Sequence, residues 1–178
     1  MIDEKLLSNC KKMQRDAQRQ LYELLSARLY FICKRYLKKE EEIEEVVADS
    51  FYTIFTKLHQ LKDDKAFIAW AKRITVNQCL LQLKKSTNFN IYLEDSNLSL
   101  QPFEDAETKL EEEDLLKLLN YLPEGCRAVF NLFAIEGFSH KQIAKELQIS
   151  EGTSKSQLNF AKTKLQKMVN NMYYQQAK

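Results

Sequence analysis

Apolar residues recur every three to four positions through most of this chain, and this spacing limits the possible fold more than any other feature. The clearest run contains Leu21, Leu24, Leu25, Leu29, Ile32, Cys33 and Tyr36. Residues at such a spacing share one face of an α-helix. The chain has only 3 glycines and 2 prolines, so residues that break helices or favour the turns of sheets are scarce. The sequence therefore predicts an all-α protein.

The same periodicity divides the chain into two small helical domains. The predicted helices cover about 3–13, 17–37, 40–61 and 66–85 in the first domain, and about 109–121, 124–135, 139–147 and 151–170 in the second. Residues 87–108 lack a sustained period and are rich in Ser, Asn and acidic residues, which is typical of a flexible linker. We expect one domain at 1–86 and a second at 109–178, joined by this acidic linker, with Thr108 as the N-cap that opens the second domain.

The charges follow the same division. Residues 1–85 hold 17 Lys and Arg against 12 Asp and Glu, a balance of +5, and residues 119–178 hold 8 against 4, a balance of +4. Residues 86–118 hold 2 against 9, a balance of −7. This layout predicts two modules that bind polyanions, joined by a segment that does not.

The reactive residue types are scattered rather than gathered. The 4 cysteines form no CxxC pair, and His59 and His140 stand apart from them, so we expect buried cysteines in a reducing cytoplasm, no metal site and no cofactor. We find no glycine-rich phosphate loop and no nucleophile beside a base, and we do not expect an enzyme. No window of the sequence is apolar enough for a signal peptide or a membrane span. These observations predict a soluble cytoplasmic protein with no membrane insertion.

Residues 139–165 have the spacing of a helix-turn-helix, a motif whose second helix enters the major groove of DNA. Ser139 and Ser150 stand where they can cap the two helices, and Gln148 stands where many such turns carry glycine. The predicted outer face of the second helix carries Thr153, Lys155, Ser156, Gln157, Asn159 and Lys162. Amides can pair with adenine, whereas hydroxyls and Lys suit phosphates. The alternative is an ordinary helical hairpin with a polar outer face.

Two longer patterns resemble a known family. Residues 122–165, "LPEGCRAVFNLFAIEGFSHKQIAKELQISEGTSKSQLNFAKTKL", resemble the C-terminal promoter-binding domain of bacterial sigma factors. Residues 46–58, "VVADSFYTIFTKL", and 67–85, "FIAWAKRITVNQCLLQLKK", resemble the sigma domain that binds core RNA polymerase and the minus-ten element. The matches follow the family's order, and only a short acidic segment separates them. The chain is therefore similar to an extracytoplasmic-function (ECF) sigma factor of the sigma-70 family.

The resemblance implies a polymerase interface on the helix that contains residues 46–58. Asp49 matches the acidic position that contacts a coiled coil of the β′ subunit in the family, and Phe51 and Phe55 are its apolar neighbours. A place for both phenylalanines in the core remains an equal alternative.

The resemblance also implies a minus-ten site on the following helix. Its expected DNA-binding residues are Lys72, Arg73, Asn77, Lys84 and Lys85. A basic helix with aromatic neighbours suits single-stranded DNA, because backbone charge and base stacking both contribute to binding. By position, residues 59–66 match the loop that captures a flipped base, and Trp70 is either a DNA contact or a core residue.

In the second domain the resemblance assigns minus-thirty-five binding to the same six residues of the outer helix face. The sequence departs from the family where Gln157 and Lys162 replace arginines, which should weaken the grip on phosphates and shift readout towards adenine. The implied function is transcription initiation. The implied partners are core RNA polymerase, through its β′ and β subunits, promoter DNA and an anti-sigma factor. Two other classes stay open: a regulator that binds duplex DNA without polymerase, and a helical adaptor that binds no DNA.

Overall fold

The computed structural model describes residues 2–85 and 112–176. Every regular element within these two ranges is a helix, which confirms the all-α prediction. The chain divides into two compact units, Met1–Lys85 and Ser86–Lys178, and each is described by itself. The predicted linker at 87–108, and the predicted N-cap Thr108, lie outside the described residues.

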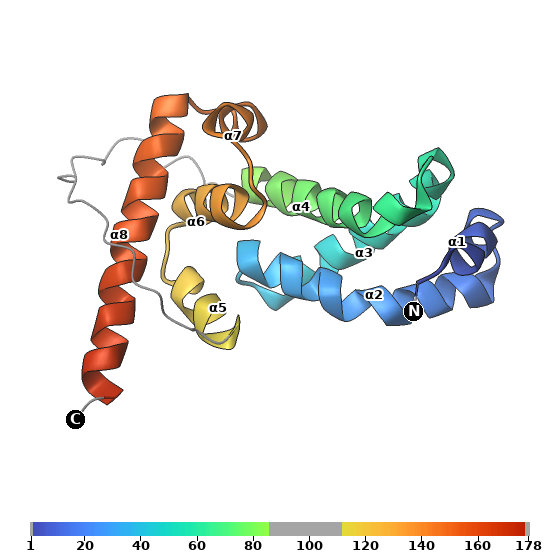
Figure 1. Ribbon diagram of the computed structural model, residues 1–178, viewed down its shortest axis with the longest axis horizontal. Helices are drawn as coiled ribbons and strands as arrows, with labels where there is room; N and C mark the ends of the chain where they lie inside the picture. The colour runs from blue at the N-terminus through green and yellow to red at the C-terminus, as the bar shows by residue number, and fades with distance from the viewer. Residues whose placement is uncertain (1, 86–111, 177–178) are drawn as a thin grey trace. The chain divides into compact units, whose positions relative to one another are not determined.

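The first unit contains α1 (Glu4–Lys11), α2 (Arg15–Tyr36), α3 (Glu40–Lys57), the 3₁₀ turns η1 (Leu58–Gln60) and η2 (Asp64–Ala66), and α4 (Phe67–Lys85). Helix α3 packs against α4, and α2 packs against both (Figure 1). Helix α1 packs on α2 and also contacts η1. The two 3₁₀ turns form the polar joint between α3 and α4.

The apolar stripe of α2 is buried in the centre of this unit. Leu21, Leu25, Leu29 and Cys33 are each at most 2% exposed. Leu24 is an exception: we expected it on the buried face, but it is 44% exposed, because α3 and α4 cover a narrower stripe than the sequence pattern suggested. Each buried leucine contributes about 1.5–3 kcal/mol through removal of its surface from water.

The second unit contains α5 (Glu112–Asn120), α6 (Glu124–Phe130), a π-helical segment η4 (Asn131–Ile135), α7 (His140–Leu147) and α8 (Glu151–Gln176). The single helix predicted over 124–135 is therefore an α-helix that widens in its last turns. One core cluster gathers residues of α5, α6 and α8 and the turn between α5 and α6: Leu118, Leu119, Leu122, Cys126, Ala161 and Leu165. Helix α8 is the long element of this unit and packs against both α6 and α7 (Figure 1).

The cysteines behave as small apolar residues. All four are buried and none forms a disulfide, as the sequence predicted. Burial raises the pKa of Cys79 well above its ordinary value and raises the pKa of Cys126 to about 11. As thiols rather than thiolates, they contribute packing and little reactivity.

None of the helices in the described ranges combines the length and the apolar character that a membrane span requires.

Candidate nucleic-acid interface

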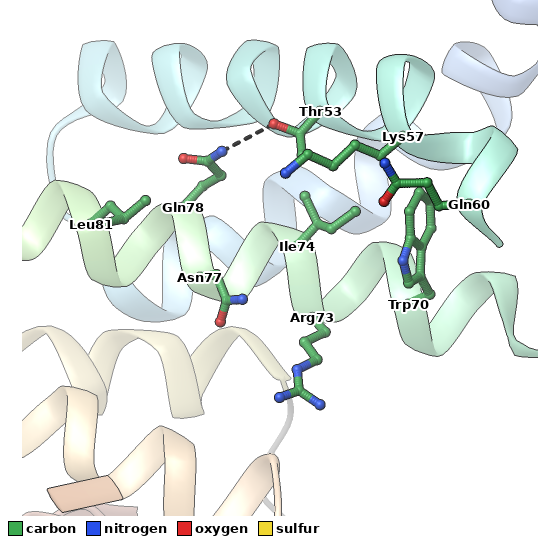
Figure 2. Close-up of a pocket in the computed structure, with 9 residues that line it drawn as sticks. All are labelled: Thr53, Lys57, Gln60, Trp70, Arg73, Ile74, Asn77, Gln78 and Leu81. Atoms are coloured by element: carbon green, nitrogen blue, oxygen red, sulfur yellow. Dashed lines mark hydrogen bonds between the residues drawn. The ribbon is translucent and has the colours of Figure 1, made fainter. Parts of the chain in front are cut away.

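A groove of about 530 Å³ lies between α3 and α4 in the first unit (Figure 2). It is lined by Thr53, Lys57, Gln60, Trp70, Arg73, Ile74, Asn77, Gln78 and Leu81. Three of these side chains are amides, two are cations and one is an indole. Amides offer donors and acceptors, and an aromatic ring offers a stacking surface, so the lining combines the groups that bind a nucleobase.

The amides of the groove are held to different degrees. Gln78 Nε2 donates a hydrogen bond to Thr53 Oγ1 at 3.1 Å, and this bond ties α4 to α3 (Figure 2). Asn77, which the sequence predicted as a DNA contact, is exposed. Gln60 is exposed as well, so the groove presents one amide fixed by the protein and two amides open to solvent.

Trp70 is neither a fully buried core residue nor a fully exposed one, and its contact with DNA stays a prediction. Its ring packs at an angle against the buried ring of Phe67, with centroids 6.2 Å apart. The indole is nevertheless only half-buried and lines the groove (Figure 2). One side of the ring therefore packs on its own helix, and the part that lines the groove is available for stacking.

The cations predicted on α4 do not all share one face. Arg73, Asn77 and Lys84 lie within roughly 40° of one another around the helix axis, whereas Lys72 and Lys85 lie about 100° or more from Arg73. Arg73, Lys84 and Lys85 are exposed, and Lys72 is half-buried. The structure therefore brings together three of the five predicted residues and separates the other two from them.

On α3, the three residues predicted to bind polymerase have different surroundings. Asp49 is exposed and Phe55 is half-buried. Phe51 is only 4% exposed and lies between Tyr22 and Phe55, with ring centroids at 4.5 and 5.8 Å. Of the two alternatives left open for Phe51, burial supports a place in the core and not a surface role, because almost none of its ring is left to contact a partner.

Sequence reasoning missed two exposed aromatic residues beside Asp49 and Phe51. Tyr52 is 73% exposed on α3, and Tyr22 is 48% exposed on α2. Tyr52 lies three positions after Asp49, a spacing that places both on one side of a helix. That spacing was the signal that could have identified it.

Helices α7 and α8 begin at the caps that the sequence predicted. The Ser139 side chain accepts from the Gln142 backbone N–H, and Gln142 Oε1 accepts from the Ser139 backbone N–H at 2.9 Å, which completes a capping box. Ser150 Oγ accepts from Thr153 N at 2.9 Å and opens α8. Gln148 ends α7 in the left-handed conformation, with φ of 58°. Glutamine therefore occupies a left-handed backbone position that glycine usually occupies at the end of a helix.

A contact that the sequence did not predict also joins α7 to α8. His140 Nδ1 lies 2.9 Å from Ser154 Oγ, and Ser154 is fully buried. The His140 ring stacks on Phe133, with centroids 4.8 Å apart. The polar pair satisfies a buried hydroxyl and fixes the angle between the two helices.

The outer face of α8 is narrower than predicted. Lys155 is exposed, and Thr153, Ser156, Asn159 and Lys162 are half-buried. Some of these groups are engaged in the unit itself. Thr153 Oγ1 lies 2.8 Å from the hydroxyl of the cap Ser150, and Ser156 Oγ donates to Thr153 O at 3.0 Å.

Gln157 is not on that outer face and requires a correction. It is only 6% exposed, because it shares the buried side of α8 with Leu158 and Ala161, against α6. Gly125 of α6 leaves the space for it: a Cβ at Gly125 would lie 3.2 Å from Gln157 Oε1. Gln157 therefore packs α6 against α8 and does not face a DNA groove.

Comparisons with known proteins agree with this architecture. The family model described as Sigma-70 region 2 matches residues 21–89, and the model described as Sigma-70, region 4 matches residues 112–165. Together these matches cover most of both units, in the order expected from the sequence.

Relatives and solved structures give the same result over nearly the whole chain. The chain is 23% identical to the ECF RNA polymerase sigma factor SigW of Bacillus subtilis, over 97% of this chain and 99% of that one. It is 25% identical to the ECF sigma factor SigM of Mycobacterium tuberculosis, over 94% and 84%. Among solved structures, it resembles CnrH in complex with the cytosolic domain of CnrY, with a TM-score of 0.52, 22% identity and coverage of 95% and 97%.

The fold and the two matched regions define a protein of the sigma-70 family. Within that family the chain belongs to the ECF RNA polymerase sigma factors, to which its relatives belong. It is a transcription initiation factor, and core polymerase binding and promoter recognition are typical of its family.

Proposed function

We propose that residues 1–86 form the domain that binds core RNA polymerase and the minus-ten element, and that residues 109–178 form the domain that binds the minus-thirty-five element. Residues 87–108 would then be the linker. The observation that carries the proposal is the groove between α3 and α4, which combines amides, cations and an indole beside an exposed basic helix face.

The groove is suited to an unpaired base of the minus-ten element. Asn77 and Gln78 would pair with the polar edge of the base, and Trp70 would stack on its ring. Flipping a base out of the duplex costs a few kcal/mol, and stacking on an aromatic side chain returns about 1–3 kcal/mol. Arg73 and Lys84 would hold the backbone phosphates along the same face of α4. Polymerase binding would supply the remaining free energy.

The second domain would place α8 in the major groove of duplex DNA. Lys155, Asn159 and Lys162 lie at i, i+4 and i+7 and share one side of α8. Asn159 could pair with adenine through both amide groups, and the lysines would contact phosphates. Thr153 and Ser156 would contact the backbone at the start of α8. Gln157 has no part in this proposal.

Core polymerase is the proposed partner of the exposed part of α3. Asp49 would contact the β′ subunit, with Phe55 and Tyr52 beside it, and the β subunit is a further proposed partner. Catalysis would belong to the polymerase, so the chain itself would be no enzyme and would act in the cytoplasm. An anti-sigma factor is a further proposed partner, since a similar solved structure is the sigma factor RpoE in complex with the anti-sigma factor NepR from Bartonella quintana.

Run-off transcription with bacterial core polymerase tests the proposal. The assay compares core polymerase with and without this protein on a library of promoter fragments. Defined start sites should appear only with the protein, and Asp49→Arg should abolish them. Glu44→Arg is the matched control, because Glu44 is equally an exposed acid of α3 but lies about 140° from Asp49 around the axis. Duplex binding without polymerase-dependent initiation would favour a stand-alone regulator instead.

A further inference from the structure

A single lysine of α1 holds the joint between α3 and α4. Lys11, the last residue of α1, places its Nζ atom 2.7 Å from Asp64 Oδ1 and 3.4 Å from the carbonyl oxygen of Leu61. These partners are 53 and 50 positions away in the sequence. The ion pair is partly shielded, since the two side chains are 28% and 22% exposed.

The two contacts lie at the two ends of one short segment. Leu61 directly follows Gln60, which ends η1 and lines the groove. Asp64 begins η2, the turn that leads into α4. One ammonium group therefore fixes the spacing between the end of η1 and the start of η2. It acts next to the groove but does not line it.

Within this segment, local bonds shape each turn separately. Leu61 N donates to Leu58 O at 3.1 Å, and Asp63 Oδ1 accepts from Lys65 N at 3.0 Å. Each of these bonds remains inside its own turn. The Lys11 contacts differ from these local bonds. Among the hydrogen bonds described for residues 58–66, they are the ones that connect η1 to η2, and they do so through α1. A charge-assisted bond is suited to this, because it is shorter and stronger than a neutral one.

We infer that Lys11 is a positioning residue for nucleic-acid binding: through Asp64 and Leu61 it fixes the joint that carries Gln60, and so sets the shape of the groove mouth for an unpaired base. The inference rests on the proposed function of the groove. It concerns residues outside the DNA-contacting set, on a helix that the sequence connected with no function.

A positioning role and a direct DNA contact of Lys11 predict opposite effects of Asp64→Asn on the affinity for DNA. If Lys11 touched phosphate, Asp64→Asn would remove a repelling acid and strengthen binding. If Lys11 acts through Asp64, the same substitution loosens the joint and weakens binding. Removing the acid beside a polyanion site should therefore reduce affinity.

The experiment uses the full chain and its single tryptophan, Trp70, which lines the groove. Trp70 fluorescence is followed while single-stranded oligomers of deoxyadenosine, deoxycytidine or thymidine, about 12 nucleotides long, are added at several salt concentrations. The variants are Lys11→Met, Asp64→Asn and the double variant. Lys12→Met is the control, because Lys12 is the neighbouring exposed lysine. Circular dichroism confirms that each variant is folded at the temperature of the titration.

Each single variant should raise Kd about two- to fivefold, the range expected for one partly exposed ion pair. The double variant should have a Kd no higher than that of the single variant with the higher Kd. The slope of log affinity against log salt concentration (the salt slope) should stay unchanged in all three variants. Lys12→Met should bind as the wild type does. Tighter binding by Asp64→Asn, with a slope reduced by about 0.7 in Lys11→Met, would show a direct phosphate contact and overturn the inference. Unchanged affinity in all variants would also overturn it. A wild-type protein whose Trp70 fluorescence does not respond to any oligomer would instead refute the proposed function of the groove.

Discussion

Replacing Gln148 by glycine should stabilise the second unit, although it removes a long side chain from the turn between α7 and α8. Gln148 has φ of 58°, a conformation that side chains with a Cβ atom disfavour. Its side chain is exposed, so the substitution disturbs no core packing. The backbone bond that closes the turn, from Ile149 N to Ala144 O at 3.0 Å, does not depend on the side chain.

Two opposing contributions determine how much Gln148→Gly changes the free energy of unfolding. A residue with a Cβ loses roughly 1–2 kcal/mol in the left-handed region relative to the right-handed one. Glycine in turn loses about 0.4–1 kcal/mol more than alanine through the greater freedom of the unfolded chain. The balance favours Gln148→Gly by about 0.7 kcal/mol, which corresponds to a Tm increase of about 3–6 °C for a unit of this size. Gln148→Ala keeps the strain and should leave the Tm close to that of the wild type. Gln148→Val, which is branched at Cβ, should lower it.

Thermal unfolding of the full chain provides the assay and its internal control. Circular dichroism follows all helices, whereas Trp70 fluorescence follows only the first unit, in which the single tryptophan lies. Gln148→Gly should have the highest Tm, the wild type and Gln148→Ala should have similar values below it, and Gln148→Val should have the lowest. The midpoint of the transition seen by Trp70 fluorescence should be the same in all of them. Equal stability of the Gly and Ala variants would show that residue 148 is not strained. The physical account of this turn would then be wrong.

Three further predictions concern the second unit. Because burial raises the pKa of Cys126 from 9.0 to about 11, the unfolded chain loses this thiol proton first as pH rises. Stability should therefore fall between about pH 9 and 11 by at most roughly 1.4 kcal/mol per pH unit, and Cys126→Ala should flatten this fall in pH-dependent denaturant titrations. Lys155→Ala should reduce the salt slope of duplex binding by about 0.9. Gln157→Ala should leave this slope unchanged and lower the Tm. The opposite pattern would show that Gln157 contacts DNA. Ser139→Ala should cost about 1 kcal/mol through loss of the cap, seen as a lower midpoint in urea, and an unchanged midpoint would contradict the capping box.

The helices could be predicted because their signals are local. Three- to four-residue spacing places α2 within two residues of its observed ends and gives the observed start of α3, although α3 ends at Lys57, four residues before the predicted end. Ser139 and Ser150 cap where their sequence positions suggested. The errors come from packing between elements. Leu24 has the right spacing for burial, yet its neighbours leave it 44% exposed. Whether a residue at the edge of an apolar stripe is buried depends on how much of the stripe the neighbouring helices cover. That coverage is a property of the packing between helices, and the spacing within one helix does not reveal it.

Gln157 shows the same limit for the site. Its polar side chain and its position on the second helix both suggested a DNA contact. Its burial depends on Gly125, thirty-two positions earlier, which leaves room for the amide between α6 and α8. The Lys11–Asp64 pair was equally out of reach, because a charged pair at such a separation has no local signature. By contrast, Asn77 and Arg73, which the family resemblance singled out, are exposed and line the groove, and their contact with DNA stays a prediction.

The two proposed DNA faces share one chemical composition, and this determines how the protein can work. Each face aligns one asparagine with two cations: Arg73, Asn77 and Lys84 on α4, and Lys155, Asn159 and Lys162 on α8. Two phosphate contacts give a salt slope of only about −1.4 for single strands and about −1.8 for duplex DNA. Raising salt from 50 to 200 mM should then weaken either face only about tenfold, far less than for proteins with six or more phosphate contacts. Affinities of this size do not hold a promoter alone. The faces therefore have to act together, since binding of one raises the effective concentration of the other, and with the polymerase. A steep salt slope for an isolated face would contradict this division of the work.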